Sequence, residues 1–357
     1  MRRVVTFVSL LFTGCLSWPV AASVPSTMLR AALPESLAAT QVVDYVERQL
    51  SDLGECPEEG IRFRVEINGR RVQLVMLKKL DITVVGSALR TYRGSVDGRP
   101  ATFVKDTDQL IVVLPGATEP ERLVFDREPG SGPRRVVEAR GRESVPVNRP
   151  RLRRPRSVAL AEPKPLRIYV FIHDDVGTTS WGSIHADYFS WWARDLQERL
   201  GSVIGEVQIN FVSGMRGVTD MNYRSLPNTF ESRFEAFDGF IDRAMRIVTS
   251  RGLHRQPDYS PSRTKFILLT RHKIFGKSGI GQHEGDAAFA TMSSYYTPAH
   301  ELGHTLGAMH EAGEVRYQNA WWCETNMVSP SLDIRTACRV YSEANIANIR
   351  AYLTRSP

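Results

Sequence analysis

The pattern of apolar and polar residues differs between the two halves of the chain. From residue 24 to residue 127 the two kinds alternate, as in RFRVEINGRRVQLVMLKKLDITVV, and this period of two is typical of β-strands with one buried face. Asn68 with Gly69, and Asp97 with Gly98, interrupt the alternation with dipeptides that favour tight hairpin turns. A short helix is expected ahead of the strands, over residues 36–51. The first half is therefore predicted to be rich in β-hairpins.

The second half alternates apolar strands with amphipathic helices. Strands are predicted at 166–175, 207–214 and 265–270 from short apolar runs such as KFILLT. The predicted core residues of three helices are Ile184, Tyr188, Trp192, Leu196 and Leu200 in the first, Phe230, Phe234, Phe237, Ile241 and Val248 in the second, and Ile346, Ile349 and Leu353 in the last. A chain of 357 residues suits two domains, here a β-rich one followed by an α/β (α+β) one.

The N-terminus has the features of an export signal. It reads MRRVVTFVSLLFTGCLSWPVAAS, with two arginines, an apolar stretch, and small residues at Val20 and Ala22. This order predicts a signal peptide over residues 1–22, cut after Ala22. Lipid attachment at Cys15 is the alternative, although Phe12 stands where an aliphatic residue is expected. No later run approaches the roughly 18 apolar residues that span a bilayer. We therefore expect a secreted or periplasmic protein with no transmembrane segment after the signal peptide.

A basic, proline-rich segment separates the two halves. Residues 134–167 hold about eleven Arg or Lys against three Glu, and they carry much of the net charge of +7. Sites that bind single-stranded nucleic acid combine such charge with stacking aromatic side chains, which this stretch lacks, so nucleic-acid binding is not expected. Residues 131–165 are instead predicted to be an exposed linker. Its arginines suit a processing cut near Arg154 or Arg156, and a linker that is merely solvated is the alternative.

The strongest chemical signal is the stretch AHELGHTLGAMHE. On a helix, His300 and His304 lie one turn apart on the same face, so both imidazoles reach one ion at about 2.0–2.1 Å. Glu301 lies about 100° around the helix from His300, where it faces the open side of the metal as a general base and not as a ligand. His310 reaches the same ion only if the chain turns, and Gly307 has the conformational freedom for that turn. The spacing predicts one Zn²⁺ held by the three histidines.

The pattern H-E-x-x-H-x-x-G-x-x-H resembles that of the metzincin zinc peptidases. The resemblance implies a methionine turn beneath the metal, and Met327 in CETNMVSPS stands at the matching place. Glu311, directly after the third histidine, looks like the astacins, whereas NMVSP looks like the reprolysins (adamalysin/ADAM-type). The chain is identified as reprolysin-like with an astacin-like Glu311. This implies a catalytic domain at 166–357, with a mixed twisted sheet and a zinc helix, that is a zinc metalloendopeptidase.

The resemblance also implies a mechanism. Three neutral imidazoles leave one position on zinc for a water, whose pKa falls toward about 7 and whose proton Glu301 takes as it attacks the scissile carbonyl. Protein or peptide substrates would bind as an added antiparallel strand along residues 286–293, and Ser329 to Asp333 would wall the pocket. The alternatives are a metal-binding module without catalysis, which has no need of Glu301, and a structural surface lipoprotein.

Three cysteines follow the signal peptide. In an oxidising compartment Cys323 and Cys338 could form a disulfide that brackets Met327. That pairing leaves Cys56 without a partner in an exported chain. An unpaired thiol in such a protein calls for an explanation.

Residues 23–130 are similar to a reprolysin prodomain in the spacing of aromatic and glycine positions between Tyr92 and Gly98. The resemblance implies a latent precursor, in which this β-rich prodomain inhibits the enzyme until the linker is cut. Cys56 could occupy the fourth position on zinc, since thiolate is a strong zinc ligand, although neighbouring glutamates disfavour the thiolate. Steric blockage of the cleft by the hairpins is the alternative, and the sequence leaves both open.

Overall fold

The computed structural model describes residues 36–53, 57, 60–114, 121–127, 162–253, 259–318, 321–329 and 335–355. Several sequence predictions concern residues outside these ranges: the signal peptide, the lipidation site Cys15, the unpaired Cys56, and the processing sites near Arg154 and Arg156. These stay predictions. All described residues belong to one compact unit, Pro34–Pro357.

Hairpin strands fill the described first half, and strands alternate with helices in the second. The strands are β1 (Ile61–Ile67), β2 (Arg70–Val84), β3 (Arg90–Val96), β4 (Arg99–Lys105), β5 (Gln109–Leu114), β6 (Glu121–Asp126), β7 (Lys164–Ile172), β8 (Ile204–Val212), β9 (Thr264–Thr270), β10 (Gly279–Gly281), β11 (Ala287–Thr291), β12 (Val315–Gln318), β13 (Trp321–Glu324) and β14 (Thr336–Ala337). The α-helices are α1 (Val42–Leu53), α2 (Trp181–Ile184), α3 (Ser190–Leu200), α4 (Phe230–Ser250), α5 (Thr297–Thr305) and α6 (Glu343–Arg355). Single turns of other helix types are η1 (Ala39–Gln41), η2 (Asp174–Val176), η3 (His185–Phe189, a π-helix), η4 (Tyr223–Ser225) and η6 (His310–Ala312).

The two predicted hairpin turns are confirmed. Asn68 and Gly69 between β1 and β2 have φ angles of 53° and 75°, and Asp97 and Gly98 between β3 and β4 have 49° and 77°. Positive φ at both central residues matches the twist of the flanking strands, which is why Asn-Gly and Asp-Gly favour such turns. The alternation of apolar residues therefore located the hairpins correctly.

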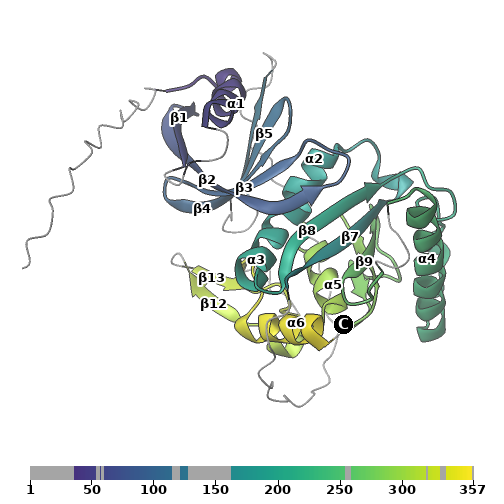
Figure 1. Ribbon diagram of the computed structural model, residues 1–357. Coiled ribbons are helices and arrows are strands. Elements are labelled where there is room, and N and C mark those ends of the chain that lie inside the picture. The colour runs from purple at the N-terminus through teal and green to yellow at the C-terminus, as the bar shows by residue number, and fades with distance from the viewer. Residues whose placement is uncertain are drawn as a thin grey trace, which may run out of the picture. The chain divides into compact units, whose positions relative to one another are not determined.

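The strands of both halves join in one mixed, 11-stranded sheet. Its order is β10-β11-β9-β7-β8-β2-β3-β4-β5-β6, and β1 pairs with β2 off this path. Figure 1 shows β2 and β3 of the first half beside β8 and β7 of the second. Strands β11, β9, β7 and β8 run parallel to one another, β10 pairs antiparallel with β11, and the strands of the first half pair antiparallel among themselves. The joint is a parallel pairing in which Ile82, Thr83 and Val84 of β2 face residues 207–209 of β8. The β-rich first half is thus an extension of the second half's sheet.

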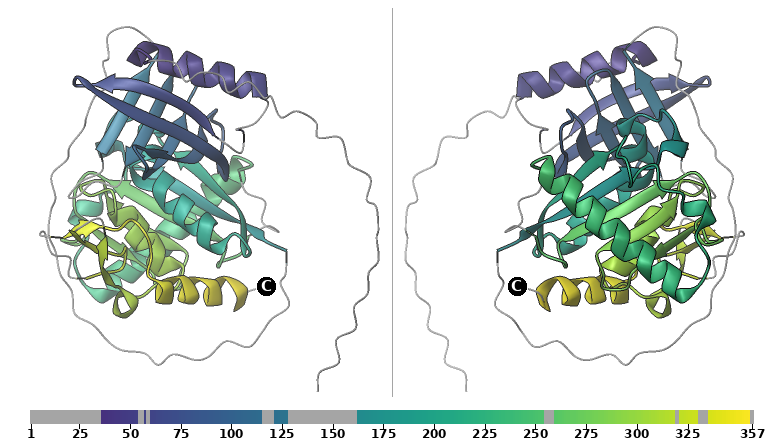
Figure 2. Two further views of the ribbon diagram at one scale, coloured as in Figure 1. Left: turned by 90° about the vertical axis from the view of Figure 1, so that its left-hand side faces the viewer. Right: turned by 90° about the vertical axis from the view of Figure 1, so that its right-hand side faces the viewer.

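Different helices cover the two faces of the second half's sheet. Alternate residues of β7 point to opposite sides, so Ile168 and Val170 join a core with α3, α5 and α6, while Tyr169 and Phe171 pack with α4. Figure 2 shows α4 on one side of the strands and α3 on the other. The first of these cores also takes in residues of the first half: Leu80, Ile82, Val84, Leu89, Val104, Ile111, Val113 and Val124.

Polar contacts reinforce the joint between the halves. The Nη1 atom of Arg122 on β6 lies 2.8 Å from the Asp187 carboxylate on η3. Thr91 Oγ1 lies 2.8 Å from Nε2 of His185, a fully buried ring whose pKa burial lowers to about 3. From the far end of the chain, the buried Arg339 donates to the carbonyl of Leu114, at 3.4 Å.

One core prediction for α4 is wrong. Phe230 and Phe234 are 77% and 56% exposed, although Phe237, three residues further on, is buried. The buried residues of α4 begin at Ala236, so its first two turns extend past the hydrophobic core that covers the rest of the helix. Helical periodicity identifies a face but does not say how far along the helix the partner reaches. No described helix, α4 included, is long and apolar enough to cross a membrane.

We predict that the halves stay together when the linker is cut. A site for a specific protease, placed within residues 128–161, allows the cut to be made after folding. Because β2 pairs with β8 and the halves share a core, the cut chain should elute as one species in size-exclusion chromatography and separate only in denaturant. Elution of two fragments in native buffer would contradict this.

Point substitutions on β2 test the same joint in the intact chain. Ile82, 3% exposed, lies in the shared core, so Ile82→Ala should lower the free energy of unfolding by about 2–5 kcal/mol. The neighbouring Asp81 is exposed, and Asp81→Ala should change the free energy of unfolding by less than about 0.5 kcal/mol. Urea denaturation of the two variants measures both values.

Candidate metal centre and cleft

The predicted zinc helix is α5, and it ends where the sequence suggested. Pro298 lies in its first turn, where a missing N–H costs nothing. Past its last residue, Gly307 has a φ of 87°, and its N–H donates to the His304 carbonyl at 2.9 Å. The N–H of Ala308 bonds to the Gly303 carbonyl at 2.8 Å, which closes the turn. The chain then returns as η6, which begins at His310.

The turn brings the three histidines together. Nε2 of His310 lies 2.9 Å from Nε2 of His300 and 3.0 Å from Nε2 of His304. One nitrogen from each ring lies within 4.8 Å of the others. In a tetrahedral zinc site with bonds of about 2.0–2.1 Å, ligand nitrogens are about 3.3–3.4 Å apart, so the cluster is close to the required spacing.

The hydrogen bonds of His300 and His304 fix tautomers whose Nε2 lone pairs point toward a common position that suits a cation. Nδ1 of His300 donates to the Asn326 carbonyl at 2.6 Å, and Nδ1 of His304 donates to the Ala308 carbonyl at 3.2 Å. Each neutral ring then presents an unprotonated Nε2. His310 Nε2 faces both lone pairs and carries at most one proton to share, whereas a metal ion satisfies all three nitrogens. The donor set therefore fits zinc.

Burial keeps the imidazoles neutral. It lowers the pKa of His300 to about 4, with a further lowering from the neighbouring His310. Burial also lowers the pKa of His304 well below its ordinary value. Burial lowers the pKa of His310 as well, and the negative charge of Glu311 counteracts part of that lowering. A neutral ring has the lone pair that a metal needs, so the cluster is ready for an ion at neutral pH.

Met327 lies directly against the zinc helix. It is fully buried, and a Cβ added to Gly303 on α5 would lie 2.8 Å from its Sδ atom. Tyr341 packs beside it, donating its hydroxyl to the Ala299 carbonyl at 2.6 Å and accepting from Trp192 Nε1 at 2.8 Å. The predicted methionine is therefore under the helix that carries two of the histidines.

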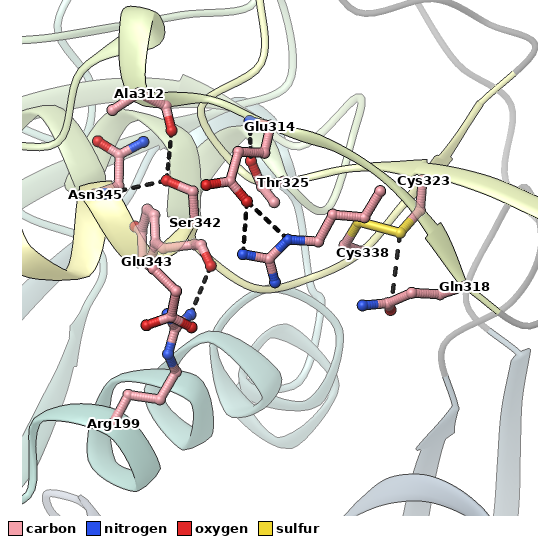
Figure 3. Close-up of polar contacts among 12 residues, drawn as sticks. Arg199, Ala312, Glu314, Gln318, Cys323, Thr325, Cys338, Ser342, Glu343 and Asn345 are labelled. Carbon is pink, nitrogen blue, oxygen red and sulfur yellow. Dashed lines mark hydrogen bonds and ion pairs between the residues drawn. A yellow bond between two sulfur atoms is a disulfide. The ribbon is translucent and has the colours of Figure 1, made fainter.

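The predicted disulfide is present and lies near this region. Cys323 on β13 is bonded to Cys338, which follows β14 (Figure 3). Between these cysteines, Thr325 exchanges backbone and side-chain hydrogen bonds with Glu314, each of 2.9 Å. The strand that leads to Met327 is thus tied both to the loop after the third histidine and to the segment before α6.

Glu301 is buried against the edge strand β10. A Cβ at Gly279 would lie 2.6 Å from its Oε1 atom, and one at Gly281 would lie 2.4 Å from its backbone oxygen, so only glycine permits this approach. Burial raises the pKa of the Glu301 carboxyl to about 8, while the charge of Lys277 and a bond from the Gly281 N–H lower it. The Glu301 carboxyl is therefore held in a fixed position at the cleft, and its burial favours the neutral form.

The histidines and Glu301 line a cleft of about 300 Å³. The other lining residues are Arg233, Lys277, Ser278, Gly279, Ile280, Gly281, Tyr296, Thr297, Val328 and Ser329. No residue of the described part of the first half is among them. Of the predicted wall from Ser329 to Asp333, Ser329 lines the cleft and residues 330–334 lie outside the described residues. Glu311, directly after the third histidine, is exposed.

The prediction of the substrate strand needs correction. Residues 286–293 correspond to β11, which is paired on both sides, with β9 and with β10. Among the described strands, the end of the sheet beside the cleft is β10, Gly279–Gly281. Strand β10 has only three residues, two of them glycines, so it has no alternating apolar pattern by which the sequence could predict it. The alternating glycines themselves, a mark of close backbone approach, were the available signal.

Two further lining residues without a sequence prediction carry positive charge. Arg233 on α4 has uncharged described partners, since its Nε donates to Asn228 Oδ1 at 3.1 Å and its guanidinium lies 5.9 Å from the ring centre of Phe275. Lys277 precedes β10, and its charge acts on Glu301. A single surface-like arginine or lysine has no distinguishing pattern in the sequence, so these needed the structure.

Comparison with known proteins adds one likeness of fold. No family model and no curated protein matches the chain. Among solved structures, it is similar to metalloproteinase-II from Bacteroides fragilis, with a TM-score of 0.55 and 15% sequence identity over 86% of this chain and 95% of that chain. A chaperone–substrate complex matches with a TM-score of only 0.35 and 8% identity, over 72% of this chain and 39% of that chain, and carries no argument. The first likeness shows a shared fold that extends beyond the second half.

Substituting Gly303 should disturb the contact between α5 and Met327. Alanine favours helices over glycine by about 1 kcal/mol, yet Gly303→Ala should destabilise the metal-free chain by about 1–3 kcal/mol, because its Cβ collides with Met327 and with Tyr341. Gly182 on α2 is the matched control, since its nearest neighbour would be at 3.5 Å and Gly182→Ala should be neutral or stabilising. Opposite signs in urea denaturation are expected, and equal effects would contradict the packing argument.

Proposed function

We propose that this protein is an exported zinc metalloendopeptidase of the metzincin type. The observation that carries the proposal is the convergence of three imidazole nitrogens, with a buried carboxyl facing the same cleft beside an open sheet edge. The fold shared with a bacterial metalloproteinase supports it. His300, His304 and His310 are the proposed ligands of one zinc ion, and Glu301 is the proposed general base.

Each part of the site would have a separate role in peptide hydrolysis. Bound at the three histidines, zinc would keep one position open, lower the pKa of water there toward about 7 and polarise the scissile carbonyl. Glu301 would accept the proton from the attacking water and pass it to the leaving amine. The Gly281 N–H fixes the Glu301 carboxyl for both transfers. The backbone of β10 would hold an extended substrate by strand addition.

The charges of the cleft bear on the class of substrate. Arg233 and Lys277 both line the cleft, and their charges would be joined there by that of a bound zinc ion. In the described part of the cleft, Glu301 is the acidic lining residue. We expect substrate segments with an aspartate or glutamate within about three residues of the scissile bond, given a strand rise of about 3.3 Å per residue.

Export and latency belong to the same proposal. The disulfide between Cys323 and Cys338 suits an oxidising compartment, as a signal peptide would require. The first half remains the proposed inhibitory prodomain, and the cut would relieve inhibition without releasing this half, because β2 stays paired with β8. No described hairpin residue of 36–127 lines the cleft, so steric blockage by the hairpins has no described contact in its favour, while Cys56, the other proposed route, lies outside the described residues. A precursor with Cys56→Ser separates these two routes, because early activity supports thiol ligation and persistent latency supports occlusion.

Two substitutions separate metal binding from chemistry. His304→Ala should abolish stoichiometric zinc binding, because one of three ligands is lost. Glu301→Gln should keep one zinc per chain while cleavage of peptides falls by at least about a hundredfold, as when a general base is removed. Metal analysis and peptide hydrolysis measure the two effects. A wild-type chain without zinc, or unchanged turnover in Glu301→Gln, would contradict the proposal.

The preference for acidic residues is tested by changing the cleft charges. Arg233→Glu combined with Lys277→Gln should abolish the enrichment of acidic residues near the cuts in a proteome-derived peptide library. Each lost charge pair at about 4 Å in a wet cleft is worth about 1 kcal/mol, or about fivefold in preference. Arg246→Glu is the control, because Arg246 is exposed on the same helix and lies about 20 Å further along it. An unchanged preference in the double variant would rule out these two residues.

A further inference from the structure

The third histidine is held differently from the first two. His300 and His304 belong to a helix, and each has its second ring nitrogen bonded to a carbonyl. His310 follows the end of that helix, in a single 3₁₀ turn. Among the described residues, no carbonyl or carboxylate bonds to its Nδ1 atom. Apart from the contacts of its Nε2 atom with the other two rings, the position of this imidazole therefore depends on the backbone that carries it.

Two buried side chains at the start of α6 hold that backbone. The side-chain amide of Asn345 bonds to both backbone groups of Met309, accepting from its N–H at 2.7 Å and donating to its carbonyl at 3.1 Å. Ser342 donates its hydroxyl to the carbonyl of Ala312 and accepts from the Asn345 N–H at 3.0 Å (Figure 3). Met309 precedes His310 and Ala312 follows it, so the backbone is hydrogen-bonded to buried side chains on both sides of His310.

The side chains of Asn345 and Ser342 are themselves held in place by burial and by contacts between α6 and α3. Asn345 and Ser342 are both fully buried, so water does not compete for these bonds. The first turn of α6 is itself fastened to α3, since Arg199 pairs with Glu343 at 2.7 Å and donates to the carbonyl of Tyr341 at 2.5 Å. Helix α6 therefore supports a segment whose own helical hydrogen bonds are limited to one 3₁₀ turn, from Ala312 N–H to the Met309 carbonyl and from Gly313 N–H to the His310 carbonyl.

We infer that Asn345, assisted by Ser342, is a positioning residue that sets the place of the third metal ligand. It acts through the backbone of Met309 and touches neither the metal nor the substrate. The inference rests on the proposed zinc site. Outer partners of metal ligands typically change metal affinity by about tenfold to a hundredfold, and we expect a loss in that range for Asn345→Leu, which removes both bonds to Met309 at similar volume.

Zinc affinity of the full chain, measured by competition with a chelator, tests the inference. Asn348→Leu is the matched control, because this asparagine lies one turn further along α6 and its amide nitrogen has no hydrogen-bond partner. It should bind zinc as the wild type does. The visible spectrum of the cobalt-substituted protein is a second readout, and it should change in Asn345→Leu because the His310 ligand moves. Should Asn345→Leu fail to fold, Ser342→Ala takes its place, with an expected loss of several-fold.

A second destabilised variant separates positioning from general destabilisation. Ile82→Ala changes a residue of β2 that does not line the cleft, so it should lower the free energy of unfolding by about 2–5 kcal/mol and leave zinc affinity unchanged. A loss of zinc affinity in Ile82→Ala as large as that in Asn345→Leu, or wild-type affinity in Asn345→Leu, would overturn the inference while leaving the zinc site standing. A wild-type chain that binds no zinc would instead contradict the proposed function and, with it, this inference.

Discussion

The metal centre depends on the reversal of the chain after α5. A helix rises about 1.5 Å per residue, so a continued α5 would place His310 about 9 Å beyond His304, out of reach of a shared ion. Gly307 permits the reversal with a φ of 87°, and a Cβ there would also approach Tyr352 to 3.3 Å. The returning loop then packs on Met327, since a Cβ at Gly313 would lie 3.0 Å from that residue's carbonyl. The turn thus packs closely against both the methionine segment and α6.

Sequence reasoning succeeded where the information is local. The i, i+4 histidines and a glycine turn are properties of a few adjacent residues, as are the Asn-Gly and Asp-Gly hairpins. The pairing of β2 with β8 was not foreseen, because nothing in residues 82–84 specifies a partner at 207–209. The hydrogen bonds between Asn345 and Met309 were not predicted for the same reason. Asn345 is distant from Met309 in the sequence, and its surroundings there are those of an ordinary helix residue.

The sheet gives the cleft a firm support on one side and an open edge on the other. Strand β7 lies between β8 and β9 and is paired along most of its length, whereas β10 pairs with β11 alone over three residues. The first half of the chain covers the opposite edge, where β8 would otherwise present unpaired backbone groups. Among the described strands of this sheet's second half, only the edge at the metal centre is left for an extended ligand.

The disulfide between Cys323 and Cys338 links the stability of the fold around the metal centre to the redox state of the compartment. It closes a loop of 15 residues that contains Asn326, whose carbonyl orients the ring of His300. In the chain-entropy model a cross-link of that size restricts the unfolded loop by about 3 kcal/mol. With the thiols reduced, the unfolded chain regains that freedom, and the folded state loses about the same stability relative to it. The fold around the metal centre is therefore more stable in an oxidising compartment than in a reducing one.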